Sequence, residues 1–232
     1  MTIRIVTDSA CDLPQYIVDQ HKISIVPLSV RFGEHEFIDR QDLTTEQFWK
    51  RCDSSPVLPE TAAPSPGQFE AEFRKLAAEG ATGIVMISLS GILSATMQSA
   101  ELAAKAVAGH ISVRVVDSRS GSMGQGITVI ACAKLAETGA SLDEVVATGE
   151  SLANRSKVWG ALDTLENLKK GGRIGGAKAM MASALSIKPI IEVVDGKIEE
   201  GGKQRTRSKA LAFLLEKVRD AGPIENLAVL QA

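Results

Sequence analysis

The segment Ile84-Val85-Met86-Ile87-Ser88-Leu89-Ser90-Gly91 passes from a short run of apolar residues into a loop of small polar residues. Four consecutive large apolar residues predict a buried strand. The alanine-rich stretch that follows, at 95–108, predicts a helix. A strand, a polar loop and a helix in this order are typical of an α/β fold built on a parallel sheet.

The same alternation extends on both sides of this segment. Short β-branched runs are separated by helical patterns, as expected of strand–helix–strand units whose helices cover the faces of a parallel sheet. We therefore predict an N-terminal α/β domain over residues 1–150. Its further strands are expected at 3–6, 23–30 and 113–116, and further helices are expected to begin at Pro66 and Gly126.

The second half of the chain has a different pattern. Asp195-Gly196 separates two strand-like runs and is a hairpin signal, so it predicts an antiparallel pair of strands. This favours a C-terminal α+β domain over residues 151–232. Leu227–Leu230 predicts a buried strand two residues before the last residue, and we therefore expect the sequence to be part of a longer chain. Other elements expected here are a capping-box helix from Ser141, helices at 165–169 and 177–185, and strands at 187–194 and 198–199.

Composition excludes several classes of protein. The net charge of −2 offers no general surface for nucleic acid, and apolar runs such as 130–133 are far too short to cross a bilayer. The N-terminus lacks the apolar stretch of a secretory signal, and the three cysteines have neither metal-ligand nor CxxC spacing. We therefore predict a cytoplasmic protein without metal or nucleic acid and with at most transient membrane contact. Aromatic residues make up only 4%, so its core should be aliphatic.

Small polar residues gather where the predicted strands end. Ligands of open parallel sheets bind at the carboxyl ends of the strands. Hydroxyl groups and the N–H groups of helix N-termini can hold a carboxylate or a phosphate there. Turns and helix N-caps require the same residue types, so both interpretations stay open. The clusters are Thr7-Asp8-Ser9, Thr61 with Ser65, Ser88-Leu89-Ser90-Gly91 with Ser94, and Asp117-Ser118 with Ser120 and Ser122.

The segment Ser120-Gly121-Ser122-Met123-Gly124 is similar to the nucleophile elbow of α/β-hydrolases, with serine in place of the first glycine. Such an enzyme needs its histidine downstream of the nucleophile. All three histidines precede Ser122 in this sequence. A serine hydrolase or acyltransferase using Ser122 or Ser94 is therefore kept as the alternative function.

Two basic segments remain. The run Lys169-Lys170-Gly171-Gly172-Arg173-Ile174-Gly175-Gly176 lacks the Lys and Ser or Thr of a phosphate loop, because Ala177 follows the last glycine. A helix C-cap explains its glycines and lysines but leaves Arg173 exposed and unexplained. The second segment fits either a solvated face or a docking site for an acidic partner or phosphate, and contains Lys203, Arg205, Arg207 and Lys209.

Five segments, in order along the chain, jointly resemble the DegV family. They correspond to its TDSxxDLP opening, its TSQPSPGEF-type and SSGLSGTYQSA segments, its DS…SMGxG element and its LKKGGRI run. In this sequence they begin at Thr7, Thr61, Ser90, Asp117 and Leu168.

The resemblance implies a two-domain DegV-like fold in which one long-chain fatty acid lies in a buried tunnel between the domains. It implies that the protein is not itself an enzyme and needs no cofactor. It presents the fatty acid carboxylate to a separate ATP-dependent bacterial fatty acid kinase, which forms acyl-phosphate for phospholipid synthesis. Thr61 and Ser94 match the residues that hold the carboxylate, and Arg173 matches the one linked to kinase engagement. Candidate pocket-lining residues are Ser9, Ser90, Gly91, Ser118 and Ser122.

This sequence departs from the family pattern at Ala95 and Met97, where glycine and tyrosine are usual. The family's C-terminal histidine would lie beyond the last residue given, so it is not assigned. The lipid hypothesis also has independent physical support. Burying roughly 15 methylenes contributes ~12 kcal/mol before ordering costs, and an aliphatic wall suits such a chain. Besides the hydrolase, a binding protein for sugars or dihydroxyacetone remains an alternative.

Overall fold

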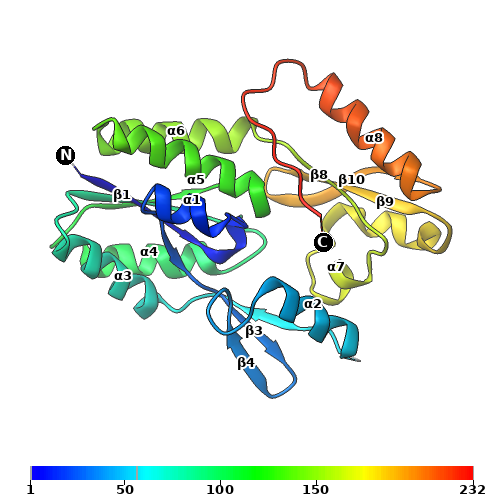
Figure 1. Cartoon of the computed structure of the whole chain (residues 1–232), viewed down its shortest axis with the longest axis horizontal. Coiled ribbons are helices and arrows are strands. Elements are labelled where there is room, and N and C mark those ends of the chain that lie inside the picture. Colours follow the sequence, from blue (N-terminus) through cyan, green and yellow to red (C-terminus); the bar gives the residue numbers. More distant parts are fainter. Residues whose placement is uncertain (1, 56, 232) are drawn as a thin grey trace. The chain divides into compact units, whose positions relative to one another are not determined.

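A computed structural model of the chain describes residues 2–55 and 57–231, without the side chains of 182–186. The contacts divide the chain into two units, Met1–Arg155 and Ser156–Ala232 (Figure 1). The first contains a parallel sheet with helices on both faces, and the second contains an antiparallel sheet with helices. The predicted combination of an α/β unit and an α+β unit is confirmed.

Four parallel strands form the main sheet of the first unit, in the order β2-β1-β6-β7. The predicted strand at 84–87 is the centre of β6, which pairs with β1 on one side and β7 on the other. From β1 the chain goes first to β2 on one side and later to β6 on the other, so the strand order reverses between β1 and β6. The strands are β1 (Ile3–Asp8), β2 (Ser24–Val26), β6 (Gly83–Ser88) and β7 (Val113–Asp117).

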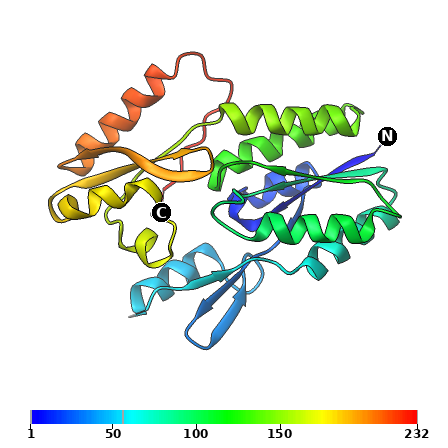
Figure 2. The ribbon, with the colours of Figure 1, turned by 180° about the vertical axis from the view of Figure 1, so that it is seen from behind.

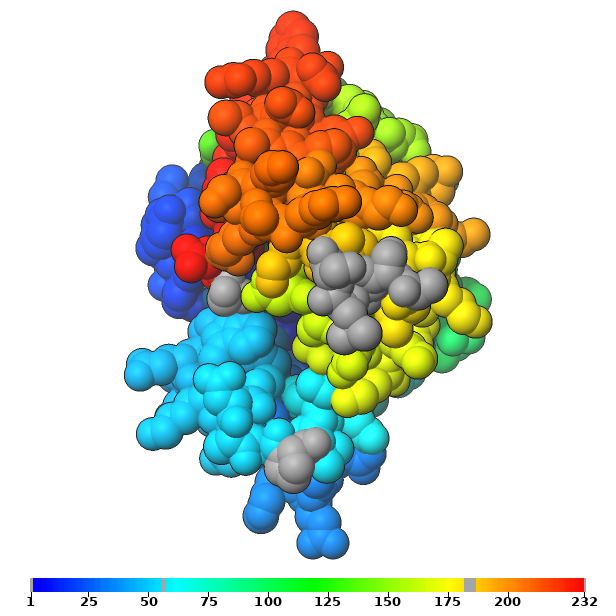
Figure 3. All heavy atoms as spheres, turned by 90° about the vertical axis from the view of Figure 1, so that its right-hand side faces the viewer, coloured from blue at the N-terminus to red at the C-terminus, as the bar shows by residue number. Residues whose placement is uncertain are grey.

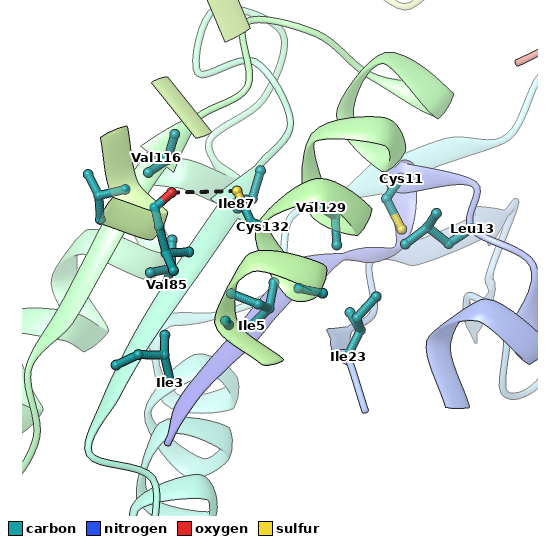
Figure 4. Packing of buried hydrophobic residues seen from close by; sticks show 14 of the residues in the cluster. Ile3, Ile5, Cys11, Leu13, Ile23, Val85, Ile87, Val116, Val129 and Cys132 are labelled. Carbon is teal, nitrogen blue, oxygen red and sulfur yellow. Dashed lines mark hydrogen bonds between the residues drawn. The ribbon is translucent and has the colours of Figure 1, made fainter. Parts of the chain in front are cut away.

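Alternate residues of the strands pack on opposite faces of this sheet. Ile84 and Met86 belong to a core cluster with helices α3 and α4, whereas Val85 and Ile87 belong to a cluster with α5 and α6. Figure 4 shows the second cluster, in which the Cys132 thiol of α5 donates a hydrogen bond to the Val145 carbonyl oxygen of α6. Figure 2 shows the sheet and its helices from behind. The helices are α1 (Gln15–Gln20), α3 (Pro66–Ala78), α4 (Thr96–Val107), α5 (Ser122–Glu137) and α6 (Leu142–Arg155).

A second, antiparallel sheet in the first unit corrects the prediction of one strand at 23–30. That run forms two strands in different sheets, β2 and β3, separated by Pro27, which has no N–H to continue the first ladder. The antiparallel sheet has the order β4-β3-β5, and helix α2 follows β4 with a capping box at Thr44 and Gln47. These elements, of which the sequence analysis anticipated only part of β3, are β3 (Ser29–Phe32), β4 (His35–Ile38), α2 (Thr45–Ser54) and β5 (Glu60–Ala62).

The second unit contains an antiparallel sheet in the order β10-β9-β8. Asp195 and Gly196 have φ of 48° and 78° and connect β9 to β10, which confirms the hairpin prediction. The helix expected at 177–185 is a 3₁₀-helix. The elements are β8 (Val158–Ala161), α7 (Glu166–Lys170), η2 (Gly175–Ser186), β9 (Lys188–Val194), β10 (Lys197–Gln204) and α8 (Arg207–Asp220).

The strand prediction at Leu227–Leu230 is wrong. This segment is irregular and largely exposed, and it pairs with none of the described strands. Helix α8, orange to red in Figure 3, also carries exposed apolar side chains, Leu211 and Leu215.

Gly126 provides a test of the close packing between α5 and the loop after β1. A Cβ at this buried position would lie 2.6 Å from the Cys11 carbonyl oxygen. Gly126→Ala is expected to lower the free energy of unfolding by about 1–3 kcal/mol in urea titrations, because backbone cannot move aside cheaply. Gly67→Ala, where the nearest atom is 3.9 Å away, is the matched control and should cause no loss. Equal stability of both variants would contradict this account of the packing.

Candidate ligand-binding site

Three polar loops meet at one edge of the parallel sheet. Because β1, β6 and β7 are parallel neighbours, the loops that follow them lie together at their carboxyl ends. These are the loops that begin at Asp8, Ser88 and Asp117. The strand order reverses between β1 and β6, and in open parallel sheets ligands bind outside the carboxyl ends of the strands at such a reversal. The structure thus brings three of the four predicted hydroxyl clusters to one end of the sheet.

A buried hydrogen-bond network joins the ends of β1 and β6. The Asp8 carboxylate accepts hydrogen bonds from the N–H of Leu89 at 2.9 Å and of Ala10 at 3.1 Å. The Gln125 amide, from α5, donates to Asp8 Oδ2 at 3.1 Å and to Thr7 Oγ1 at 2.9 Å. Asp8, Thr7 and Gln125 are fully buried. The network therefore fixes Leu89, the residue that precedes the Ser90–Ser94 loop.

Burial raises the pKa of Asp8 from its usual 3.8 to about 6, although its hydrogen bonds from Leu89, Gln125 and Ala10 lower it. None of the described lysine or arginine side chains bonds to this carboxylate. Burial without a neighbouring cation disfavours the charged form. Sequence analysis had placed Asp8 in a polar cluster but did not single it out, and Gln125 was missed. The only available signal was their place inside two of the family-like motifs.

The loop after β6 is also tied to the loop after β7. The Ser90 N–H donates to the Ser120 carbonyl oxygen at 2.7 Å, and the Ser118 N–H donates to the Ser88 carbonyl oxygen at 3.0 Å. The Gly91 N–H approaches the Asp117 carboxylate at 3.3 Å. These bonds position the predicted lining residues Ser90, Gly91 and Ser118 at the edge of the sheet.

Two of the predicted lining serines use their hydroxyl groups to hold loops. Ser9 Oγ accepts a hydrogen bond from the Leu28 N–H at 3.1 Å, and Ser118 Oγ donates to the Ser120 carbonyl oxygen at 3.2 Å. Both side chains are buried. The turn interpretation is thus supported for these two serines.

Ser94 lies in the turn that starts α4. Its N–H donates to the Ser90 carbonyl oxygen at 3.1 Å, and its hydroxyl lies 2.9 Å from Thr96 Oγ1 and accepts from the Thr96 N–H at 3.3 Å. Ser94 is only partly buried, whereas Thr96 is fully buried. Its hydroxyl is therefore held in a fixed position at the N-terminus of a helix.

Thr61 lies in β5, four residues before Ser65, whose side chain caps α3. It is exposed and lines an open hollow with Ser29, Arg31, Glu36, Glu60 and Ala62. Helices α3 and α4 pack side by side, and each leads back to the amino ends of the strands. Their N-termini therefore lie at the carboxyl edge, so Thr61 and Ser94 precede the beginnings of two adjacent helices.

Ser122 has the strained geometry of an elbow but lacks the base. Its φ of +52° is in the left-handed region at the start of α5, and the Asp12 carboxylate accepts its hydrogen bond. His21 pairs with Glu137 Oε1 at 2.8 Å at the far end of α5, and His110 precedes β7 at the opposite edge of the sheet. The third histidine, His35, is in β4. Within the described residues, no group of three or more His, Cys, Asp or Glu could hold a metal ion.

Arg173 lies in the second unit, beyond the C-terminus of α7. The Arg173 N–H donates to the Leu168 carbonyl oxygen at 2.9 Å and the Gly172 N–H to that of Lys169 at 3.1 Å, which is the Schellman pattern. Gly172 has the required positive φ of 72°. The helix C-cap interpretation is therefore confirmed for Gly171 and Gly172, whereas Gly175 and Gly176 begin η2. The Arg173 side chain is exposed, and its guanidinium donates to the Gly171 carbonyl oxygen.

The fold and the site together define a class: a two-unit α/β protein with hydroxyl-bearing loops at the switch point of a parallel sheet. The chain belongs to the DegV family, whose model, described as an uncharacterised protein family, matches residues 2–232. A DegV domain-containing protein of Streptomyces coelicolor is 37% identical over 94% of this chain and 76% of its own length. The resemblance drawn from the five motifs is confirmed.

Solved structures of this family have the same fold. A fatty-acid-binding DegV family protein from Thermus thermophilus matches with a TM-score of 0.88 at 36% identity, over 95% of this chain and 78% of its own. A stearic-acid-binding protein from Eubacterium ventriosum matches with a TM-score of 0.88 at 29% identity, over 94% and 76% of the two chains. DegV of Bacillus subtilis, a fatty acid binding protein, matches with a TM-score of 0.86 at 29% identity, over 95% and 78%.

The buried Asp8 carboxyl should make stability depend on pH. It binds a proton more tightly in the folded protein than in the unfolded chain. The free energy of unfolding of the wild type, relative to Asp8→Asn, should therefore fall as pH rises from about 4 to about 6. The expected fall is at most roughly 3 kcal/mol. Urea titrations across pH measure it, and the exposed Asp53→Asn is the control. If the difference in the free energy of unfolding between the wild type and Asp8→Asn is the same at pH 4 and pH 6, the Asp8 pKa is not raised.

Proposed function

We propose that this protein binds a long-chain fatty acid in a buried tunnel and holds its carboxylate with the hydroxyl groups of Thr61 and Ser94. The observation that supports the proposal is that Thr61 and Ser94 each precede one of two adjacent helices, α3 and α4, both of which begin at the carboxyl edge of the parallel sheet. The likeness to fatty-acid-binding structures supports the ligand class.

Neutral donors suffice for such a head group. Helix N-termini carry unpaired N–H groups and a partial positive charge, which favours an anion near α3 and α4. Hydrogen bonds from hydroxyl groups to a carboxylate are charge-assisted and short. Ser94 Oγ lies 2.9 Å from Thr96 Oγ1. With Thr96 as the donor of that bond, the Ser94 proton is available to a ligand oxygen without movement of either hydroxyl oxygen. A fixed cation is not required for binding.

In this proposal the chain is a binding subunit, and the chemistry takes place on a partner. A separate ATP-dependent fatty acid kinase would phosphorylate the carboxylate that this protein presents, and Arg173 would engage that kinase. The exposure of Arg173 supports this role, because an engaged side chain must be accessible. No cofactor is assigned to the chain, and a cytoplasmic location remains a prediction. Among the described residues, no helix has the length and hydropathy to cross a membrane.

A serine hydrolase remains the second candidate because Ser122 has positive φ at a strand-to-helix turn. Its hydroxyl hydrogen-bonds to Asp12 rather than to a histidine. A nucleophilic serine needs a general base within hydrogen-bond reach. The fatty acid function therefore has the stronger support.

Removal of the head-group hydroxyls should weaken binding. Ser94→Ala and Thr61→Ala are each expected to lower the affinity for palmitate about 10- to 100-fold, the effect of losing one hydrogen bond to a charged group. Native mass spectrometry of the purified chain, with and without added palmitate, measures occupancy. Ser99→Ala is the control, because Ser99 lies in α4, the helix that Ser94 precedes. Full retention by both variants would exclude this head-group site, and no acyl chain on the wild type would exclude the function.

Arg173 should matter for transfer but not for binding. With a fatty acid kinase and ATP supplied, Arg173→Ala is expected to form acyl-phosphate at least about tenfold more slowly, since a charged contact to the partner is lost. Palmitate occupancy should be unchanged. Arg219→Ala, also on the exposed surface of the second unit, is the matched control. Equal transfer rates for both variants would contradict the assignment.

The hydrolase alternative makes its own prediction. A fluorophosphonate probe reacts with serines that an adjacent base activates. We expect no labelling of Ser122 or Ser94, as judged by mass spectrometry of peptides from the treated protein. Stoichiometric labelling that Ser122→Ala abolishes would replace the binding function with a hydrolytic one.

A further inference from the structure

We propose that Asp8 is a positioning residue for the Ser90–Ser94 loop and that fatty acid binding at this loop is coupled to proton uptake by Asp8. The inference rests on the proposed function, because it assumes an anionic head group at Ser94. It adds a regulatory property to that site: affinity for the ligand depends on the protonation state of a buried acid that does not contact the ligand.

The first step is the short connection between Asp8 and the head-group serine. Asp8 Oδ2 accepts from the Leu89 N–H at 2.9 Å. The next residue, Ser90, accepts the Ser94 N–H on its carbonyl oxygen at 3.1 Å. Two hydrogen bonds and one peptide unit therefore separate the Asp8 carboxylate from the backbone of Ser94. A change in the protonation of Asp8 therefore acts on the loop that carries the Ser94 hydroxyl.

The second step is the absence of compensating charge. The described residues that bond to Asp8 are all neutral: the Ala10 and Leu89 N–H groups and the Gln125 amide. From β2 its neighbour in the sheet is Val26, which is apolar. An anionic head group at the partly buried Ser94 would therefore add a second negative charge at the same edge of the sheet, with no cation bonded to Asp8 to offset it.

The other titratable groups around the site do not supply that cation. Cys11, in η1, has its pKa raised to about 12 by burial and stays neutral. Asp12 follows in the same loop and is a further acid. The Arg40 charge lowers the pKa of Cys11 and of Asp12, but it is not among the groups that shift the pKa of Asp8. From β7, the Asp117 carboxylate accepts from the N–H groups of Gly91 and Arg119, so it is a further acid at this edge. The Arg119 side chain is exposed to solvent, where its field is screened.

The third step is the consequence of two like charges. Two carboxylates that share a low-dielectric region favour the neutral form of one of them. Asp8 is the one closer to neutrality, because burial has already raised its pKa to about 6. Ligand binding should raise that pKa further, and the protein then takes up a proton as it binds.

The network is suited to both protonation states of Asp8. A glutamine amide bonds to a carboxylate through Nε2 and to a protonated carboxyl through Oε1. In the described structure Nε2 of Gln125 donates to Asp8, and its buried Oε1 has no hydrogen-bond partner. The buried Ser88 hydroxyl, at the end of β6, also has no partner among the described residues. Nε2 also donates to the Ile87 carbonyl oxygen at 3.2 Å. If the amide turns when Asp8 is protonated, it therefore gives up the Nε2 bonds and gains a bond from Asp8 to Oε1.

The test is calorimetry of palmitate binding to the delipidated full chain at pH 7, in two buffers of different ionisation enthalpy. A rise of one to two units in the Asp8 pKa gives an uptake of about 0.4–0.8 proton per palmitate. The affinity should fall about 5- to 50-fold as pH rises from 6 to 9. Asp8→Asn should bind palmitate without that uptake, whereas Asp53→Asn should behave as the wild type. Hexadecanol, which has no charge, should bind without proton uptake.

The outcomes separate this inference from the proposed function. No wild-type uptake, or equal uptake by Asp8→Asn and the wild type, would overturn the coupling while leaving fatty acid binding intact. Failure of the wild type to bind palmitate at all would overturn the function itself. If Asp8→Asn does not fold, Gln125→Met provides the test. It removes a hydrogen bond to the ionised carboxyl and should move the proton uptake to higher pH, and an unchanged profile would contradict the proposal.

Discussion

The ends of the two central strands are held together by a buried acid. Asp8 closes β1, and its carboxylate accepts from the backbone of Leu89, just beyond β6. Gln125 joins the same pair from helix α5 through Thr7, Asp8 and the Ile87 carbonyl oxygen. A sheet of four parallel strands leaves unpaired backbone groups where each strand ends, and buried groups must be satisfied. Here side chains satisfy them, and the same bonds fix the loop from which α4 begins. Fold and candidate site thus depend on one cluster.

Much of the fold could be predicted because its signals are local. Four apolar residues at 84–87 and an alanine-rich run specify a strand and a helix without reference to the rest of the chain. Asp195-Gly196 specifies its turn in the same way. The failures involve information from elsewhere in the chain. Pro27 redirects one apolar run into two sheets, and Leu227–Leu230 has the composition of a strand but no partner strand in the described structure. Strand formation depends on a neighbouring edge, which composition does not report.

The candidate site was only partly visible in the sequence for a related reason. Hydroxyl clusters after strands are readable, and the parallel topology brings three of them to one edge. Whether each hydroxyl is available for a ligand depends on its partners. Ser9 and Ser118 hold loops, whereas Ser94 and Thr96 bond to each other at the start of a helix. Gln125 gave no signal, because a buried glutamine differs from an exposed one only through the tertiary contacts of its amide. The family-like motifs marked the segments without indicating these roles.

A carboxylate site without a fixed cation has a specific energetic character. A salt bridge would hold the head group tightly, but breaking a buried pair is costly because it leaves an uncompensated charge. Hydroxyl groups and helix N-termini bind more weakly and leave no stranded charge when the ligand departs. The proposed function, in which the protein holds a fatty acid and presents its carboxylate to a partner, would benefit from the second design. In the proposed coupling, the acids at this edge, Asp8 and Asp117, would weaken anion binding further, and protonation of the buried Asp8 would remove part of that repulsion. In such a site, hydrogen bonds hold the fatty acid carboxylate, and the protonation state of Asp8 sets how tightly it is held.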